Sequence, residues 1–134
     1  MSNGIITSGK RKTAVARAVI SEGNGKVTLN NKCHEILSDL DRLKIQEPLR
    51  IAENVLKKIN FNVSIGIRGG GSQGQIEAAR LALARAILKF TQSKELEKEY
   101  LSYDRGLLVA DVRRKEAYKP GDSKARKKRQ KSFR

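Results

Sequence analysis

Apolar and polar residues alternate most clearly in the segment from Phe61 to Arg68. Its apolar side chains occupy every second position, at Phe61, Val63, Ile65 and Ile67. Successive side chains of a strand point to opposite faces of a sheet. The pattern therefore predicts a strand with one buried face and one open face.

The N-terminal third of the chain predicts a second group of strands. The segment from Ile5 to Ile20 is rich in β-branched residues and loosely alternates, which favours a strand hairpin. We expect the stretch from Ser8 to Lys12 to form its turn, because a glycine and three cations interrupt the pattern there. The turn signal from Glu22 to Gly25 then leads to a short strand from Lys26 to Asn30.

Helical spacing of apolar residues appears in two longer segments. We expect a short helix near Cys33 to Leu40, and a stronger one that opens at Glu47-Pro48, since proline is tolerated in a first turn. Its apolar positions are Leu49, Ala52, Val55, Leu56 and Ile59.

A long helix is predicted from about Gln73 to Phe90, with many alanines that suit close packing. Its apolar stripe is Ile76, Ala79, Leu83, Ala86, Ile87 and Phe90. Ser93 can cap a further helix from Lys94 to Leu101. We expect a short extended piece from Leu107 to Val109, and no independent structure beyond Val112.

The order of elements is strand, strand, strand, helix, strand, helix. This order predicts an α+β fold in which helices pack on one face of a small mixed sheet. The expected organisation is a globular domain at residues 1–104 and an extended basic C-terminal tail at residues 105–134, hereafter the basic tail.

Charge changes the picture from fold to function. The chain has 134 residues and a formal net charge of +15, and the basic tail holds twelve Lys or Arg against three Asp or Glu. A segment with so little to bury cannot fold on its own hydrophobic account. It can neutralise a polyanion and release that polyanion's counterions. We therefore expect RNA or DNA as partner.

A membrane is the weaker alternative, because no apolar run approaches the roughly 20 residues that span a bilayer. The first four residues also lack the pattern of a signal peptide. A lone Cys33 beside a lone His34 can form neither an intrachain disulfide nor a protein zinc site. No catalytic motif occurs, so we expect no enzyme, no cofactor, no metal site and no small-molecule substrate.

The segment from Gly69 to Gly74 satisfies the spacing G-x-G-x-x-G between a predicted strand and a predicted helix. A dinucleotide fold needs an acidic residue on a second strand about 20 residues later, and that interval ends in a helical segment here. A phosphate-binding P-loop fails as well, because Gln75-Ile76 follows Gly74. Two interpretations remain: a phosphate contact at a helix N-terminus, or a sharp turn that requires glycine.

Basic side chains cluster at three further places: Lys10 to Lys12 with Arg17, Arg113 to Lys115, and Lys119 before Pro120. Arginine suits bidentate phosphate contacts and lysine suits point-charge contacts. A short basic turn such as Lys10 to Lys12 is usually just a solvated face, but the net charge of +15 favours binding here. Tyr118 and Phe133 are aromatic residues that can stack on a base or ribose.

Three segments together resemble the ninth small-subunit ribosomal protein family. The opening motif is Gly9 to Arg17, the central signature is Gly69 to Ile87, and the C-terminal motif is Asp111 to Glu116 followed by Lys119-Pro120-Gly121 and Lys124 to Lys127. Bacterial members tend to end in Ser-Lys-Arg, whereas this chain ends in Ser132-Phe133-Arg134. An aromatic residue before the final arginine is similar to the archaeal and eukaryotic branch.

The resemblance implies a four-stranded sheet with a left-handed βαβ crossover, like domain two of ribosomal protein S-five, plus an extended tail. It implies a cytoplasmic protein of the ribosome, on the head of the small subunit beside neighbouring head proteins. Its partners would be small-subunit ribosomal RNA and the peptidyl-site tRNA.

Charge and resemblance together give a set of expected contacts. The expected ribosomal RNA contacts are Lys10, Arg11, Lys12, Arg17, Arg68, Gly70, Gly71, Gln75, Arg113, Arg114, Lys115, Lys119, Lys124, Arg126, Lys127, Lys128, Arg129 and Lys131. The expected tRNA contacts are Ser132, Phe133 and Arg134. Two alternatives stay open: a free-standing basic RNA-binding or chaperone protein, and a nucleotide-using enzyme of a related α+β fold.

Overall fold

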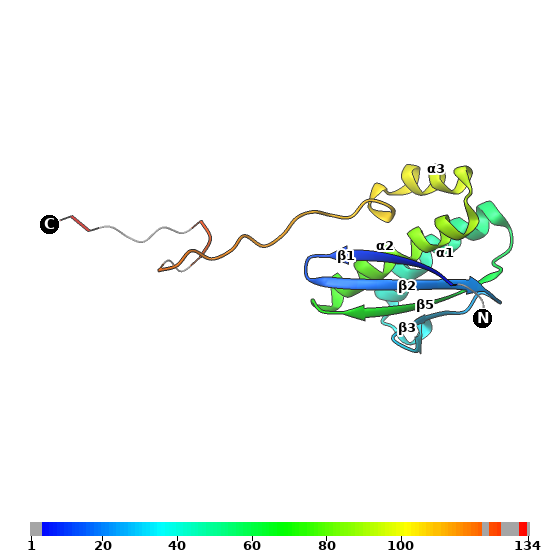
Figure 1. Ribbon diagram of the computed structural model, residues 1–134, viewed down its shortest axis with the longest axis horizontal. Helices are drawn as coiled ribbons and strands as arrows, with labels where there is room; N and C mark the ends of the chain where they lie inside the picture. The colour runs from blue at the N-terminus through cyan, green and yellow to red at the C-terminus, as the bar shows by residue number, and fades with distance from the viewer. Residues whose placement is uncertain (1–3, 122–123, 127–131, 134) are drawn as a thin grey trace.

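Five strands and three α-helices form two layers in the computed structural model, which describes residues 4–121, 124–126 and 132–133. A single sheet carries the helices on one face, and the chain then runs away from the domain (Figure 1). The strands are β1 (Ile5–Arg11), β2 (Ala14–Glu22), β3 (Val27–Leu29), β4 (Lys32–Cys33) and β5 (Phe61–Arg68). The helices are α1 (Asp39–Leu56), α2 (Ser72–Thr91) and α3 (Lys94–Tyr103), with single 3-10 turns η1 (His34–Ile36) and η2 (Arg105–Leu107).

The strand order in the sheet is β1-β2-β5-β3-β4. All neighbouring pairs are antiparallel except β3 and β5, which are parallel and are connected through α1. The α+β class and the mixed sheet are therefore confirmed. The handedness of the β3-to-β5 crossover stays a prediction.

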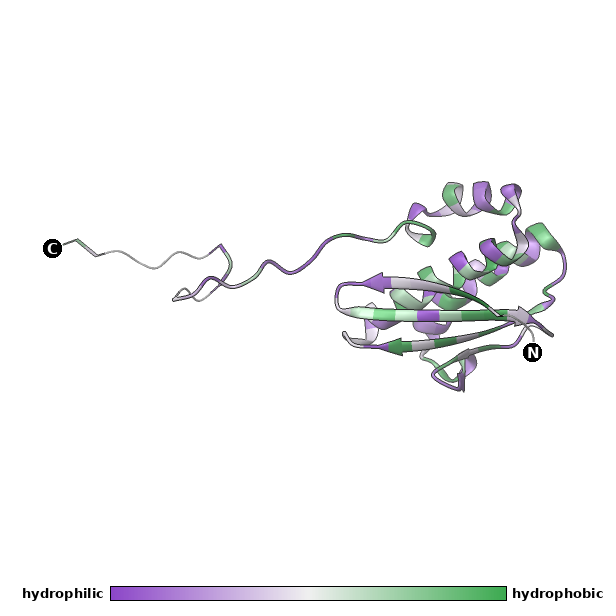
Figure 2. Cartoon of the chain, in the orientation of Figure 1, coloured by the Kyte–Doolittle hydropathy of each residue, from purple (hydrophilic) through white to green (hydrophobic). Residues whose placement is uncertain are grey.

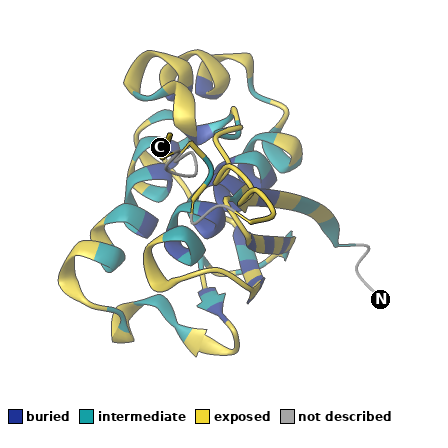
Figure 3. Cartoon of the chain, turned by 90° about the vertical axis from the view of Figure 1, so that its left-hand side faces the viewer, coloured by how far each residue is buried: buried dark blue, intermediate teal, exposed yellow. Residues whose placement is uncertain are grey.

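The core lies between the sheet and α2. Along the strands, buried apolar residues that face this core alternate with residues on the open face (Figures 2 and 3). Phe61, Val63, Ile65 and Ile67 of β5 are all buried, as the alternation predicts. The limits predicted for β5 are confirmed, and those predicted for α2 and α3 agree within two residues. The Ser93 hydroxyl accepts a hydrogen bond from the Leu96 N–H and so caps α3.

Small side chains set the spacing between the sheet and α2. Ala14, Ala16 and Ala18 of β2 are fully buried, and the alanines on the facing side of α2 are buried as well. A Cβ added to Gly9 of β1 would lie 2.3 Å from the Ala78 carbonyl oxygen. This approach is closer than any side chain allows, so Gly9 is required here by packing.

The sheet has five strands where four were expected. The additional strand β4 contains two residues and follows a two-residue turn at Asn30 and Asn31, both of which have positive φ. Such turns favour asparagine and join strands into tight hairpins. The Asn30 side chain also accepts a hydrogen bond from the Ile67 N–H, which ties the turn to β5.

The predicted start of the second helix is wrong. Helix α1 begins at Asp39, after Ser38, and passes through Pro48 in its interior. Ile45, which precedes Pro48, is buried in the core, and this packing stabilises the helix on the N-terminal side of the proline. The separate helix expected at residues 33–40 is reduced to η1, and α1 already ends at Leu56.

Two predicted connections also differ from the structure. The turn of the first hairpin is Lys12-Thr13 alone, so Lys10 and Arg11 belong to β1 and pair with Val15 and Ala14. The expected extended piece at residues 107–109 is not extended: η2 ends at Leu107, which is buried in the core, and a turn and a bend follow at Leu108 and Val109. Residues 110–119 form neither helix nor strand, and no helix of the described chain is long and apolar enough to cross a membrane.

Candidate nucleic-acid interface

Two turns meet at one end of the sheet. They are the Lys12-Thr13 turn of the β1–β2 hairpin and the glycine turn that links β5 to α2. A Cβ on Gly69 would lie 2.8 Å from the Thr13 carbonyl oxygen, and one on Gly70 would lie 2.8 Å from the Ala14 Cβ. Both glycines also have positive φ. Conformation and close packing therefore explain them, as in the structural interpretation of the glycine motif.

Gly71 and Gln75, the other two expected RNA contacts in this motif, lack the close packing and positive φ of Gly70. Gly71 precedes the first residue of α2, has ordinary extended φ and has nothing within 4 Å of an added Cβ. The Gln75 side-chain amide donates a hydrogen bond to the Gly69 carbonyl at 3.1 Å, so it braces the turn. No side chain caps the first N–H groups of α2, which are the donors that a phosphate would use.

Three of the predicted cations project from the open face of the sheet. Lys10, Arg17 and Arg68 are exposed on β1, β2 and β5. The register pairs Lys10 with Val15 and Val15 with Arg68, while Arg17 pairs with Gly66 one row away. Arg68 lies far from the other two in the sequence, and the sheet brings all three into neighbouring rows of its open face.

Together with Lys12 in the hairpin turn, these three cations form a surface that we call the basic end: Lys10, Lys12, Arg17 and Arg68. Two of them, Arg17 and Arg68, line a hollow of about 600 Å³ together with Thr13, Val15, Gly66 and Gly69. Within the described part of the chain, none of the four cations has a carboxylate at ion-pair distance. The basic end is therefore electrostatically open to an external anion.

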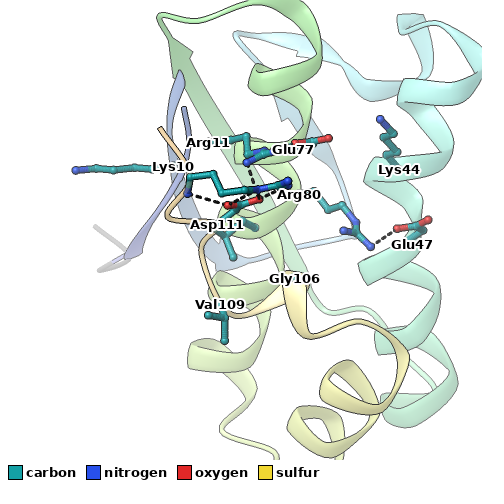
Figure 4. A pocket seen from close by; sticks show the side chains of 11 residues that line it. Lys10, Arg11, Lys44, Glu47, Glu77, Arg80, Gly106, Val109 and Asp111 are labelled. Atoms are coloured by element: carbon teal, nitrogen blue, oxygen red, sulfur yellow. Dashed lines mark hydrogen bonds and ion pairs between the residues drawn. The ribbon is translucent and has the colours of Figure 1, made fainter. Parts of the chain in front are cut away.

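Arg11 has a different environment from its neighbours in the sequence. Its Nε donates a hydrogen bond to Glu77 Oε2 at 2.6 Å, and its Nη1 lies 2.6 Å from Asp111 Oδ2. Only 17% of its side-chain surface is exposed. Figure 4 shows Arg11 between these two carboxylates, at the edge of a polar cavity of about 360 Å³. Arg11 is thus paired within the protein, although it was expected to bind RNA.

Asp111 is also held by the residue two positions later. The Arg113 backbone N–H and guanidinium both donate to its carboxylate, at 2.7 to 3.1 Å. Hydrogen bonds from Arg113, together with the charge of Arg11, lower the pKa of Asp111 well below its usual range. The same interaction raises the pKa of Arg113.

Two arginines of α2, Arg80 and Arg85, bind the chain just before Asp111. Neither was predicted from the sequence as a functional residue. Arg80 donates two hydrogen bonds to Asp104 at 3.0 Å and forms an ion pair with Glu47 of α1 at 2.6 Å. Arg85 donates to the carbonyl oxygens of Leu108 at 3.0 Å and Ser8 at 2.9 Å. The available signal was weak: Glu77 and Arg80 are neighbours at a spacing of three residues, but Arg85 lies five residues after Arg80 and is not its neighbour on the helix surface.

The later part of the basic tail is exposed where it is described. Lys115 lies 4.7 Å from the centre of the Tyr118 ring and donates to its hydroxyl, and Arg126 pairs with Glu116 at 2.9 Å. Arg114 donates to backbone carbonyls only, and Lys119 and Lys124 are exposed. Ser132 and Phe133 are exposed. The predicted contacts Lys127, Lys128, Arg129, Lys131 and Arg134 lie outside the described residues.

Cys33 and His34 do not form a metal site in the described part of the chain, where no group of three potential ligands occurs. Cys33 is a free, partly exposed thiol. The His34 Nδ1 lies 3.3 Å from the Val27 carbonyl oxygen. Both residues are accounted for by their local structure.

A sequence model of the family described as "Ribosomal protein S9/S16" matches residues 9–134, from the opening basic motif to the last arginine. The chain belongs to this family. Membership confirms the resemblance drawn from the three motifs, and the chain is accordingly a structural protein of the ribosome and not an enzyme.

Archaeal members of the S9/S16 family are similar to this chain over nearly its whole length. A protein of Thermoplasma volcanium named "Small ribosomal subunit protein uS9" is 49% identical over 131 residues, covering 97% of this chain and 98% of that protein. Proteins with the same name from Methanococcus vannielii and Methanococcus maripaludis are 45% and 46% identical, and 96% of each chain is covered. The expected archaeal-like branch is therefore confirmed, as is the ribosomal, cytoplasmic location.

Proposed function

We propose that the chain is a constituent of the head of the small ribosomal subunit that binds its RNA with the basic end and the basic tail. The names of its archaeal relatives support the subunit. The observation that carries the RNA contact is the charge of the basic end, which has no ion-pair partner among the described residues and beside which Arg113, Arg114 and Lys115 of the basic tail lie.

The two basic regions adjoin in space. A hollow of about 640 Å³ is lined by Arg11, Lys12 and Thr13 of the hairpin and by Arg113, Arg114 and Lys115 of the basic tail. Phosphate groups of a single RNA strand or duplex can contact cations on both sides of such a hollow. Neutralising several phosphates releases counterions, and this release supplies a large share of the binding free energy.

We assign graded roles to the rest of the basic tail. Lys119, Lys124, Arg126 and the cations from Lys127 to Lys131 would bind ribosomal RNA phosphates. Arg134, with Ser132 and Phe133 beside it, would reach the peptidyl-site tRNA. Phe133 is 91% exposed, so its ring is accessible for stacking on a nucleotide. The glycine turn would add the first N–H groups of α2 as phosphate donors.

Footprinting of small-subunit RNA tests the main proposal. We expect a single protected region in RNA bound by the full chain, and co-sedimentation with the small subunit after a high-salt wash. Protection without a preferred site, or release by the wash, would favour the free-standing RNA-binding or chaperone alternative.

The tRNA contact has a separate test. Deleting Lys131 to Arg134 removes no residue of the described core, so the domain should fold normally. Subunits assembled with the truncated chain should bind peptidyl-site tRNA more weakly than subunits with the full chain. Equal tRNA affinity would exclude this role while leaving the RNA-binding proposal intact.

A further inference from the structure

The segment from Asp104 to Asp111, which we call the tail root, is fastened to the domain at three points by three arginines. Arg80 binds the Asp104 carboxylate, Arg85 binds the Leu108 carbonyl, and Arg11 binds the Asp111 carboxylate. Between these points Leu107 is buried in the core and Leu108 packs against it. The tail root is therefore a built part of the domain, although it contains no strand and only one turn of helix.

The path of the tail root decides where the basic tail leaves the domain. It starts at the end of α3 and arrives at Arg11, the last residue of β1 (Figure 4). Arg113, Arg114 and Lys115 consequently line a hollow together with Arg11, Lys12 and Thr13. These three cations of the basic tail lie beside the basic end for this reason.

Such an arrangement has an electrostatic cost. Like charges repel at these separations, and Lys10, Lys12 and the three cations at 113–115 share one end of a chain whose net charge is +15. Repulsion alone would drive the basic tail away from the domain. The carboxylates of Glu77 and Asp111 oppose it, because each lies 2.6 Å from the Arg11 guanidinium that joins them.

We propose that Arg11, Glu77 and Asp111 form an electrostatic latch that holds the start of the basic tail against the basic end and thereby makes one continuous RNA-binding surface. Arg11 is a positioning residue in this scheme and does not contact RNA. Arg80 and Arg85 hold the earlier part of the tail root. The consequence for RNA rests on the proposed function, whereas the latch itself is a property of the free chain.

The latch is tested by a distance measurement on the full-length free protein. Spin labels are attached at Asn54→Cys on α1 and Ala117→Cys in the basic tail, both exposed positions, in a Cys33→Ser background. We expect a narrow distance distribution in the otherwise unaltered chain. Asp111→Asn, which keeps the shape of the side chain, and Arg11→Gln should each broaden it and shift it to longer distances.

Salt separates an electrostatic latch from ordinary packing. The Debye length falls from about 30 Å at 0.01 M to about 3 Å at 1 M ionic strength, so high salt screens the repulsion. The Asp111→Asn distribution should therefore be broadest at low salt and narrow again as salt is added. Glu22→Gln, the matched control, adds the same charge on the far end of β2 and should leave the distribution unchanged at every salt concentration.

RNA affinity tests the functional consequence of the latch. Asp111→Asn raises the net charge by one, so charge alone predicts tighter binding to small-subunit RNA. The latch predicts weaker binding, by at least about threefold, because the basic end and the basic tail no longer act as one site. Unchanged distances in both latch variants, or tighter RNA binding by Asp111→Asn, would overturn the latch. Absence of RNA binding by the unaltered chain would instead refute the proposed function.

Discussion

Arginines of the folded domain and arginines of the basic tail differ in their partners. Arg11, Arg80 and Arg85 are partly buried and bind carboxylates or carbonyls of distant segments. Arg113 and Arg126 are largely exposed, and each pairs with a carboxylate near it in the sequence. Net charge alone therefore does not identify the candidate RNA contacts, because part of that charge stabilises the protein itself.

The two regions also differ in what keeps their shape. The domain has a continuous apolar core between the sheet and α2, and its buried residues end at Leu107. The described basic tail beyond Val112 is exposed, apart from the partly buried Ala125. Removing the exposed part of the basic tail should therefore leave the stability of the domain unchanged.

The largest effect is expected from removing residues 124–134, which carry seven Lys or Arg. The slope of log affinity against log salt falls by about 0.7 to 0.9 for each phosphate that the protein no longer neutralises. We therefore expect the truncated chain to lose up to about five or six units of slope in RNA binding. Its thermal unfolding should match that of the full chain. A lower melting temperature would show that the tail supports the domain.

A change within the domain should instead lower the stability of the fold. Gly9→Ala places a Cβ 2.3 Å from the Ala78 carbonyl oxygen and 2.7 Å from the Ala82 nitrogen, so β1 must move away from α2. Overpacking of this kind costs about 1 to 3 kcal/mol in the free energy of unfolding, and backbone atoms place this case at the upper end. Chemical denaturation measures the loss.

Gly66→Ala is the matched control for that substitution. Gly66 is also a strand glycine, but it lies on the open face and an added Cβ meets nothing within 4 Å. We expect its unfolding free energy to change by less than about 0.5 kcal/mol. Equal losses for the two variants would contradict the packing explanation.

A smaller effect is expected at Tyr100, which joins α3 to α1. Its side chain is fully buried, and its hydroxyl donates a hydrogen bond to the Pro48 carbonyl at 2.8 Å. Tyr100→Phe removes the donor and should lower the unfolding free energy by about 1 kcal/mol. Tyr103→Phe, in the same helix but exposed, should have no measurable effect. Burial raises the pKa of Tyr100, so its phenol should ionise only upon alkaline unfolding.

The sequence predicted those elements whose own residues contain the signal. The alternation in β5 and the apolar stripe in α2 are local patterns, and both elements were found within a residue or two. The start of α1 was missed because Pro48 resembles a first-turn proline, while tertiary packing of Ile45 extends the helix past it. Strand β4 was missed because two residues carry no periodicity.

The residues of the candidate site also divide into those that the sequence predicted and those that it did not. The cations of the basic end were predicted from residue type, and the register of the sheet was needed to show that they adjoin. Arg11 was predicted with them as an RNA contact, and its ion-pair partners Glu77 and Asp111, which lie 66 and 100 positions later in the chain, gave no local signal. Arg80 and Arg85 gave no local sign of their partners either. Pairings over such separations follow from the fold and not from spacing.

The smallest expected effect concerns acid, and it tests whether the tail root belongs to the domain. A hydrogen bond from the Gly106 N–H, together with Arg80, lowers the pKa of Asp104 below its usual 3.8. A carboxyl whose pKa is lower in the folded state stabilises the fold above its unfolded pKa and loses that contribution as the pH falls toward the folded pKa. The melting temperature should therefore begin to fall below about pH 4.

Asp104→Asn isolates this contribution, because the amide oxygen can still accept from Gly106 while the ion pair with Arg80 is lost. We expect the variant to melt slightly below the unaltered chain at pH 7 and to approach it as the pH falls below about 4 toward the lowered pKa of Asp104. The effect is small, since the Asp104 side chain is 43% exposed and water screens the pair. A constant difference between the two proteins from pH 7 to pH 3 would mean that the charge of Asp104 does not contribute, and that Leu107 alone holds the start of the tail root.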